Sequence, residues 1–148
     1  DLFEGAAPLH TAQIAALAAA GSYDNVVFHR VIDGFMAQTG DVEHGKAGSD
    51  LARAGTGGSA YPDLPAEFSD LNYDRGVVGM ARSQSPNSAN SQFFIMFDEG
   101  AFLNGQYTIV GRVTDGMDVV DAITRGDGNN GAFVNAKQDV METVTVTD

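Results

Sequence analysis

The sequence predicts a mainly β fold in which short antiparallel strands form a closed barrel and two α-helices cover its ends. Short apolar runs rich in strand-forming residues recur along the chain, with glycine-containing turns between them. Only two segments have the apolar spacing of a helix. Glycine accounts for 18 of the 148 residues and proline for only 4, which favours tight turns over a disordered chain. There is no internal repeat or linker, so we expect a single domain over residues 1–148.

The first predicted helix covers Leu9 to Ala20. Ile14 and Leu17 lie three residues apart, which places them on one face of a helix, and helix-forming alanines are frequent around them. Gly21 follows the last residue of this pattern and can adopt the left-handed conformation that often ends a helix. We therefore expect the helix to end at Gly21.

The second predicted helix covers Met117 to Thr124. Asp115 lies where a carboxylate can cap the first backbone N–H groups of a helix. Val120 and Ile123 would form the apolar stripe that faces the core, and Gly126 would end the helix.

Strands are predicted where apolar and β-branched residues are concentrated. The Asp33-Gly34 pair lies between two such segments and is typical of a hairpin turn. Residues 41–75 lack any periodicity, and a loop of this length in a small domain is often functional. The predicted strands cover residues 26–32, 35–38, 76–81, 92–97, 107–110 and 143–146.

Composition excludes several classes of function. The net charge of −12 would repel a phosphate backbone, so nucleic acid is not an expected partner. The absence of cysteine excludes disulfides and thiolate chemistry. No apolar run approaches the roughly 18–20 residues of a membrane helix, and no secretory signal is visible. We expect a cytoplasmic protein, or a periplasmic one if a signal peptide has been removed.

Motifs for other chemistries are incomplete. Residues 40–46 have the spacing of a phosphate-binding loop, but Ala47 stands where Ser or Thr would hold magnesium. The spacing of His10, His29 and His44 fits no zinc site, and His29 lies in an apolar strand, where we expect a hydrogen-bonded core residue. No serine lies in a Gly-x-Ser-x-Gly turn. We therefore expect neither a metal nor a cofactor.

Pairs of large apolar side chains recur at three places, two of them near a glutamine, and one cation accompanies them. The aromatic residues are also compatible with a plain core, but Arg30 lies between Phe28 and Ile32 with no acidic partner evident on its strand. A cation beside an apolar patch favours an uncharged ligand that carries carbonyl groups. The three places are Phe35-Met36 with Gln38, Gln92 with Phe93-Phe94, and Phe102-Leu103.

From about Leu2 to its end, the sequence resembles the cyclophilin-type peptidyl-prolyl cis–trans isomerases, and both Phe102 and the turn from Arg82 to Ser91 resemble those of bacterial members. The matching blocks are long and follow one another in the expected order. They are Phe28–Asp41 (FHRVIDGFMAQTGD), Gly79–Arg82 (GMAR), Asn90–Ile95 (NSQFFI), Phe102–Gly105 (FLNG) and Val110–Val113 (VGRV).

The resemblance implies an eight-stranded antiparallel barrel with two capping helices and an active site on its outer face. Matched by position, Arg30 would be the catalytic arginine. Phe35, Met36, Phe94 and Leu103 would form the proline pocket. The remaining predicted site residues are Gln38 and Gln92, which would hydrogen-bond the substrate backbone, and Ala81, Arg82, Phe102 and Tyr107, which would line the groove, Arg82 mainly through its main chain.

The chain departs from the family pattern at three places. Phe102 stands where many members have Trp, and Tyr107 where many have His. Both keep an aromatic group, so we expect activity to survive, but the indole N–H is lost and cyclosporin A should bind more weakly. In the family, a strand and a turn precede the segment that corresponds to Leu2-Phe3-Glu4, so we expect the first barrel strand to be truncated.

The expected function is therefore acceleration of rotation about Xaa-Pro peptide bonds, which assists protein folding. The alternatives are a proline-peptide binding module without catalysis and a chaperone-like module. Expected partners are proline-containing peptides and unfolded or folded client proteins. No apolar heptad stripe is evident, so we expect a monomer.

Overall fold

The computed structural model describes residues 1–147, and Asp148, the last residue of the predicted domain, lies outside them. The described part is mainly β, as predicted, and its strands pair antiparallel. Its elements, in order, are α1 (Pro8–Ala19), β1 (Val26–Val27), β2 (Arg30–Ile32), β3 (Met36–Thr39), β4 (Val77–Met80), β5 (Phe93–Met96), η1 (Ala101–Leu103), β6 (Ile109–Arg112), α2 (Met117–Asp121), η2 (Asn129–Gly131) and β7 (Val140–Met141).

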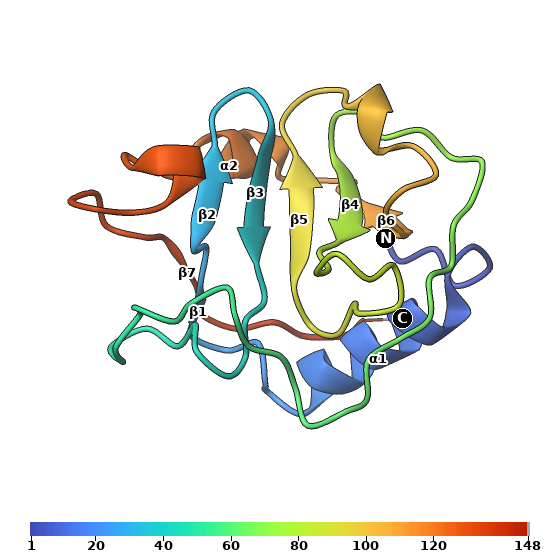
Figure 1. Ribbon diagram of the computed structural model, residues 1–148, viewed down its shortest axis with the longest axis horizontal. Coiled ribbons are helices and arrows are strands. Elements are labelled where there is room, and N and C mark those ends of the chain that lie inside the picture. The colour runs from blue at the N-terminus through green and yellow to red at the C-terminus, as the bar shows by residue number, and fades with distance from the viewer. Residues whose placement is uncertain (148) are drawn as a thin grey trace.

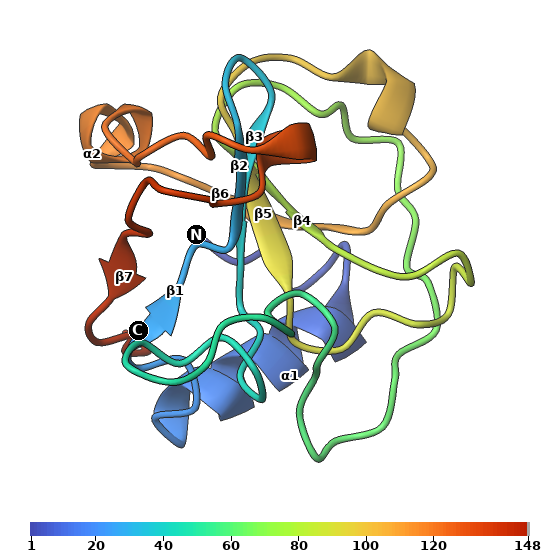
Figure 2. The ribbon, with the colours of Figure 1, turned by 60° about the vertical axis from the view of Figure 1, so that its left-hand side comes forward.

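The strands form two sheets. Five of them pair in the order β2-β3-β5-β4-β6, and β1 pairs with β7 (Figures 1 and 2). The first residues lie along the edge of β6, where Leu2 pairs with Gly111 and the Phe3 N–H donates to the Val110 carbonyl at 2.8 Å. Within residues 1–147 the pairing does not run continuously around a barrel, so the predicted closure with eight strands stays a prediction.

Helix α1 runs across one end of the larger sheet (Figure 1) and ends at Ala19. Gly21 follows its end in the left-handed conformation expected of a C-terminal cap, with φ +75°. A distant carboxylate caps its first turn. Glu67 accepts the N–H groups of Leu9 at 3.1 Å and His10 at 2.9 Å, and its Oε1 lies 2.5 Å from His10 Nδ1. Burial raises the pKa of Glu67, but these hydrogen bonds outweigh it and hold the pKa below its usual value.

Helix α2 is shorter than predicted, because it ends at Asp121 and not near Gly126. Its N-terminus follows Gly116, which has φ +85°, and no side chain caps it, so the predicted Asp115 cap is wrong. The N–H of Gly126 instead donates to the Val31 carbonyl at 2.9 Å. The loop after α2 is thereby bound to β2.

The strand predicted at residues 143–146 is wrong, and the last strand is β7 at Val140–Met141. The Asp24 carboxylate accepts the Val144 N–H at 2.9 Å. The Val144 N–H therefore binds a side chain, whereas the predicted strand would have paired it with the backbone of another strand. Among residues 1–147, no helix is both long and apolar enough to cross a membrane.

Candidate active site

The register of the larger sheet places three predicted site residues in one row. Arg30 on β2 pairs with Gln38 on β3, and Gln38 pairs with Phe94 on β5. Directly paired residues project to the same face, so their side chains lie next to one another. On β4, Gly79 is the next residue of the row. A Cβ there would collide with the Tyr73 hydroxyl and the Phe94 ring, so glycine leaves the space that this stacked ring pair fills.

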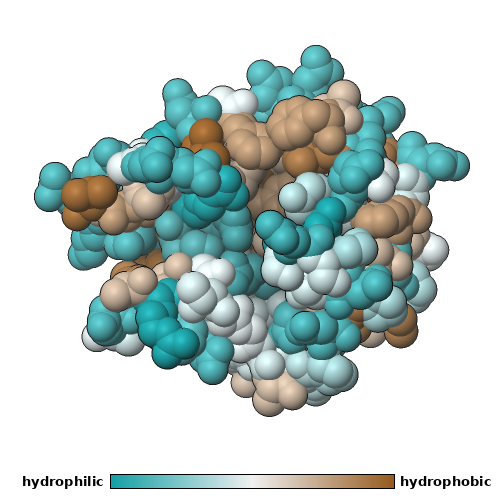
Figure 3. Space-filling model, in the orientation of Figure 1, coloured by the Kyte–Doolittle hydropathy of each residue, from teal (hydrophilic) through white to brown (hydrophobic). Residues whose placement is uncertain are grey.

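A cleft of about 780 Å³ opens on this face of the sheet. Figure 3 shows the face hollowed near its centre, with hydrophobic surface along the upper rim. Gln92 lines an adjoining cavity of about 390 Å³, which shares Gln38, Ala81 and Arg82 with the cleft. The other ten predicted site residues all line the cleft itself: Arg30, Phe35, Met36, Gln38, Ala81, Arg82, Phe94, Phe102, Leu103 and Tyr107.

Apolar side chains dominate one part of the cleft. Met36, Phe94 and Leu103 are buried and belong to the hydrophobic core beneath the face. At the rim, the rings of Phe35 and Phe102 lie 5.4 Å apart, and Phe102 is 70% exposed. The arrangement forms an apolar pocket with an aromatic rim, suited to a small uncharged ring.

A chain of hydrogen bonds orients the polar side of the cleft. Arg30 Nη1 donates to Gln38 Oε1 at 3.1 Å, and Gln38 Nε2 donates to Gln92 Oε1 at 3.0 Å. Gln92 Nε2 then donates to the carbonyls of Gly55 at 3.0 Å and Gly57 at 2.9 Å. Each of these three side chains is therefore held by its neighbour, and the last hydrogen bonds of the series go to the backbone of the 41–75 loop.

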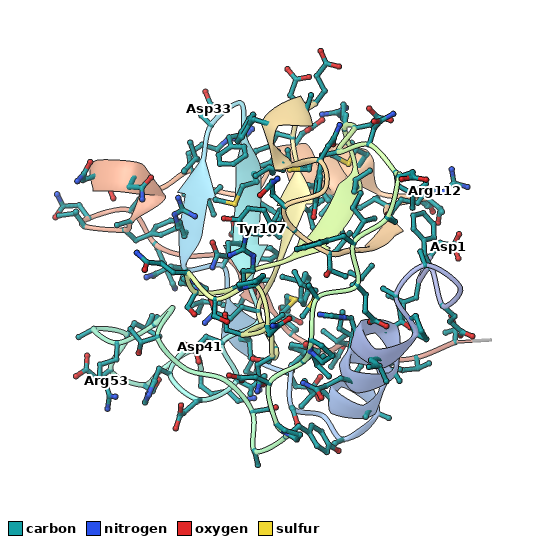
Figure 4. All side chains as sticks on the ribbon, turned by 45° about the vertical axis from the view of Figure 1, so that its right-hand side comes forward. Asp1, Asp33, Asp41, Arg53, Tyr107 and Arg112 are labelled. Carbon is teal, nitrogen blue, oxygen red and sulfur yellow. The ribbon has the colours of Figure 1, made fainter. Side chains whose placement is uncertain are left out.

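Tyr107 lies over the sheet (Figure 4) and forms a further wall of the cleft. Its ring meets Phe94 edge-on, with centroids 6.1 Å apart, and the Arg82 guanidinium carbon lies 4.4 Å from its centroid. Arg82 also donates to the Gln106 carbonyl at 2.8 Å. The side chain of Arg82 therefore packs against the Tyr107 ring, whereas the main-chain role expected for Arg82 stays a prediction.

Asp41 fastens the 41–75 loop beside the cleft. Its side chain is fully buried and accepts four backbone hydrogen bonds, from Glu43 at 3.1 Å, His44 at 2.8 Å, Gly55 at 2.7 Å and Gly57 at 3.0 Å. Burial raises the pKa of Asp41, but these donors outweigh it and keep the pKa below its usual value. The ionised Asp41 carboxylate thus fixes the position of the Gly55 and Gly57 backbone, and the carbonyls of these two residues bind Gln92.

The family described as "Cyclophilin type peptidyl-prolyl cis-trans isomerase/CLD" matches residues 1–147. The chain belongs to the cyclophilin family. It is 62% identical over 141 residues to a probable peptidyl-prolyl cis-trans isomerase of Brucella abortus. The aligned region covers 93% of this chain and 72% of the relative. This cyclophilin is accordingly a peptidyl-prolyl cis–trans isomerase.

Two solved structures share the fold of this cyclophilin. The Cryptosporidium parvum cyclophilin-type isomerase, determined in the presence of the dipeptide Ala-Pro, has a TM-score of 0.82 and 29% identity over 100% of this chain and 90% of that chain. Cyclophilin AquaCyp293 from Hirschia baltica has a TM-score of 0.76 and 26% identity over 97% and 67% of the respective chains.

Sequence reasoning missed several residues that line the cleft of this cyclophilin, among them His29, Gly55, Thr56, Gln106 and Asn130. The expected hydrogen-bonded core role of His29 is wrong: within the described residues neither ring nitrogen has a hydrogen-bond partner, and the side chain borders the cleft. Burial lowers the pKa of His29, so the ring is neutral at pH 7. The available signals were the long 41–75 loop for Gly55 and Thr56, and the Asn-Gly turn at residues 130–131 for Asn130.

Proposed function

We propose that isomerisation takes place in the cleft on the open face of the larger sheet, with Arg30 as the catalytic residue. The supporting observation is a guanidinium held at the edge of an apolar pocket. Of its five N–H donors, three are used by Gln38 and Asn130, which leaves two without a partner in residues 1–147. Two oriented charged donors beside an apolar pocket can bind a peptide carbonyl or a developing lone pair.

The mechanism acts on the resonance of the Xaa-Pro amide, whose rotation barrier is about 18–20 kcal/mol. Twisting the bond removes the resonance and leaves a lone pair on a pyramidal nitrogen. In our proposal, the pocket of Met36, Phe94 and Leu103 holds the proline ring, and Arg30 donates a hydrogen bond that strengthens as the bond twists. Arginine suits this role because its charge does not titrate near neutral pH. A hydrogen bond that is stronger in the twisted state lowers the barrier.

Gln38 and Gln92 have different roles in this proposal. Gln38 keeps one amide N–H for the substrate backbone, because only its other N–H donates to Gln92. Both N–H groups of Gln92 donate to the loop carbonyls of Gly55 and Gly57. Gln92 therefore serves first to orient Gln38 and the loop, and offers a bound peptide its carbonyl oxygen.

The expected substrates are proline-containing peptides and client proteins during folding. The Cryptosporidium parvum relative was crystallised in the presence of Ala-Pro, so this dipeptide is a suitable first ligand. A titration of isotope-labelled protein with Ala-Pro should shift the backbone amide signals of Arg30, Phe94 and Leu103, whereas Ala-Ala should shift them far less. If only the signals of residues lining the separate cavity of about 1090 Å³ between α1 and residues 144–147 shifted, the peptide would bind there and not in the cleft.

We also propose that this cyclophilin binds cyclosporin A weakly. The exposed Phe102 ring has no N–H donor at the rim of the cleft. Phe102→Trp supplies an indole N–H on a larger ring, and it should strengthen inhibition of peptide isomerisation by cyclosporin A about tenfold, the change expected from one added hydrogen bond. Equal inhibition of both proteins would contradict the assignment of weak binding to position 102.

A further inference from the structure

Asn130 contacts the Arg30 guanidinium from a distant part of the chain. Its backbone carbonyl accepts a hydrogen bond from Arg30 Nε at 3.2 Å, and its side-chain Oδ1 accepts one from Nη2 at 3.1 Å. Gln38 accepts the third, from Nη1. The guanidinium is therefore held along two edges, one by a neighbouring strand and the other by a single asparagine.

The backbone of Asn130 is suited to this double contact. Asn130 has φ 57° and ψ 33°, a left-handed conformation that asparagine tolerates better than most residues. The following Gly131 has φ +78° and lies against β2, where a Cβ would come within 2.6 Å of Ile32 and 2.9 Å of the Val31 carbonyl oxygen. The turn thus packs directly on the strand that carries Arg30.

A carboxylate fixes the loop that carries this turn. Asp127 accepts the backbone N–H groups of Val134 at 2.8 Å, Asn135 at 2.9 Å and Ala136 at 3.0 Å. These hydrogen bonds hold the pKa of Asp127 below its usual value, so the carboxylate is ionised at neutral pH. The loop is closed around Asp127 and presents Asn130 to the cleft.

We propose that Asn130 is a positioning residue for isomerisation, which holds the Arg30 guanidinium in the orientation that the twisted bond requires. This inference rests on the proposed catalytic role of Arg30. Arginine has a long, flexible stem, so its donors stabilise a transition state only when other groups fix their direction. An acceptor on each edge provides that restraint and leaves the remaining two N–H groups for the substrate.

The test uses three substitutions in one loop. Asn130→Gly tolerates the left-handed backbone and keeps the carbonyl acceptor, but it removes Oδ1. It should lower kcat about tenfold with KM changed less than about twofold, because a misdirected donor weakens transition-state stabilisation. Asn130→Asp keeps an oxygen acceptor and should stay within about threefold of the wild-type kcat. Asn135→Gly, an exposed site in the same loop, should have the wild-type kcat.

Arginine-selective ¹⁵N relaxation supplies a readout that loss of stability alone would not change. At a temperature where all variants are folded, the Arg30 Nε–H group should be more mobile in Asn130→Gly than in wild type, Asn130→Asp or Asn135→Gly. If Asn130→Gly matches Asn135→Gly in kcat while Arg30→Ala is inactive, the positioning role is wrong and the role of Arg30 stands. If Arg30→Ala retains full activity, the proposed catalytic role fails, and the positioning role fails with it.

Discussion

Arg30→Ala is expected to lower kcat/KM for a short Xaa-Pro peptide by about 100- to 1000-fold, the range found when one preorganised transition-state donor is removed. The side chain is partly exposed and its hydrogen bonds go to Gln38 and Asn130, so alanine removes the donor without opening a cavity in the core. The loss should lie in kcat, because the apolar pocket that binds the proline ring is unchanged. NMR exchange spectroscopy measures both isomers directly, without a coupled protease.

Arg30→Lys is the matched control for charge. Lysine keeps the positive charge but lacks the planar fork that Gln38 and Asn130 hold from two sides. If the direction of the donors matters, Arg30→Lys should stay at least about tenfold below wild type and above Arg30→Ala. Near-normal activity of Arg30→Ala, with the same thermal stability as wild type, would remove Arg30 from the mechanism.

Most of the strands that carry the site were predictable from the sequence, because short apolar blocks specify strands. Arg30, Gln38 and Phe94 lie far apart in sequence, yet they form one row across three strands. Their grouping was expected from the resemblance of the blocks around them, not from periodicity. The structure supplies the physical reason, which is that direct pairing places all three side chains on one face.

Loop residues were not predictable in the same way. Asn130 reaches the cleft because Asp127 closes its loop and Gly131 packs against β2, and neither contact produces a pattern in the sequence. The error at residues 143–146 has a similar cause, since the Asp24 carboxylate binds the Val144 N–H. At Val144 a side-chain contact overrides local strand propensity, and around Asn130 local propensity predicts no element at all.

Asp41→Asn is expected to destabilise the protein by about 3 kcal/mol, because the buried asparagine NH₂ group cannot accept the hydrogen bonds of two of the four backbone N–H groups that bind Asp41. The carboxylate is fully buried and binds Glu43 and His44 through Oδ1, and Gly55 and Gly57 through Oδ2. The melting temperature should fall by roughly 10 °C. Asp70→Asn is the control, because it removes the same charge from an exposed position in the 41–75 loop and should melt like wild type.

The same substitution should change the pH dependence of stability. The folded-state pKa of Asp41 lies below its usual value, so its contribution is present above the unfolded pKa of about 3.9 and is lost as pH falls through the folded pKa. The gap in melting temperature between wild type and Asp41→Asn should therefore be widest near neutral pH and narrow below about pH 4. A gap that stays constant down to pH 2 would mean that the ionised carboxylate is not the stabilising form.

The folded Asp41→Asn variant should also have a raised KM, because the Gly55 and Gly57 carbonyls that Asp41 positions bind Gln92 beside the cleft. An unchanged KM would mean that the loop does not influence substrate binding in the cleft.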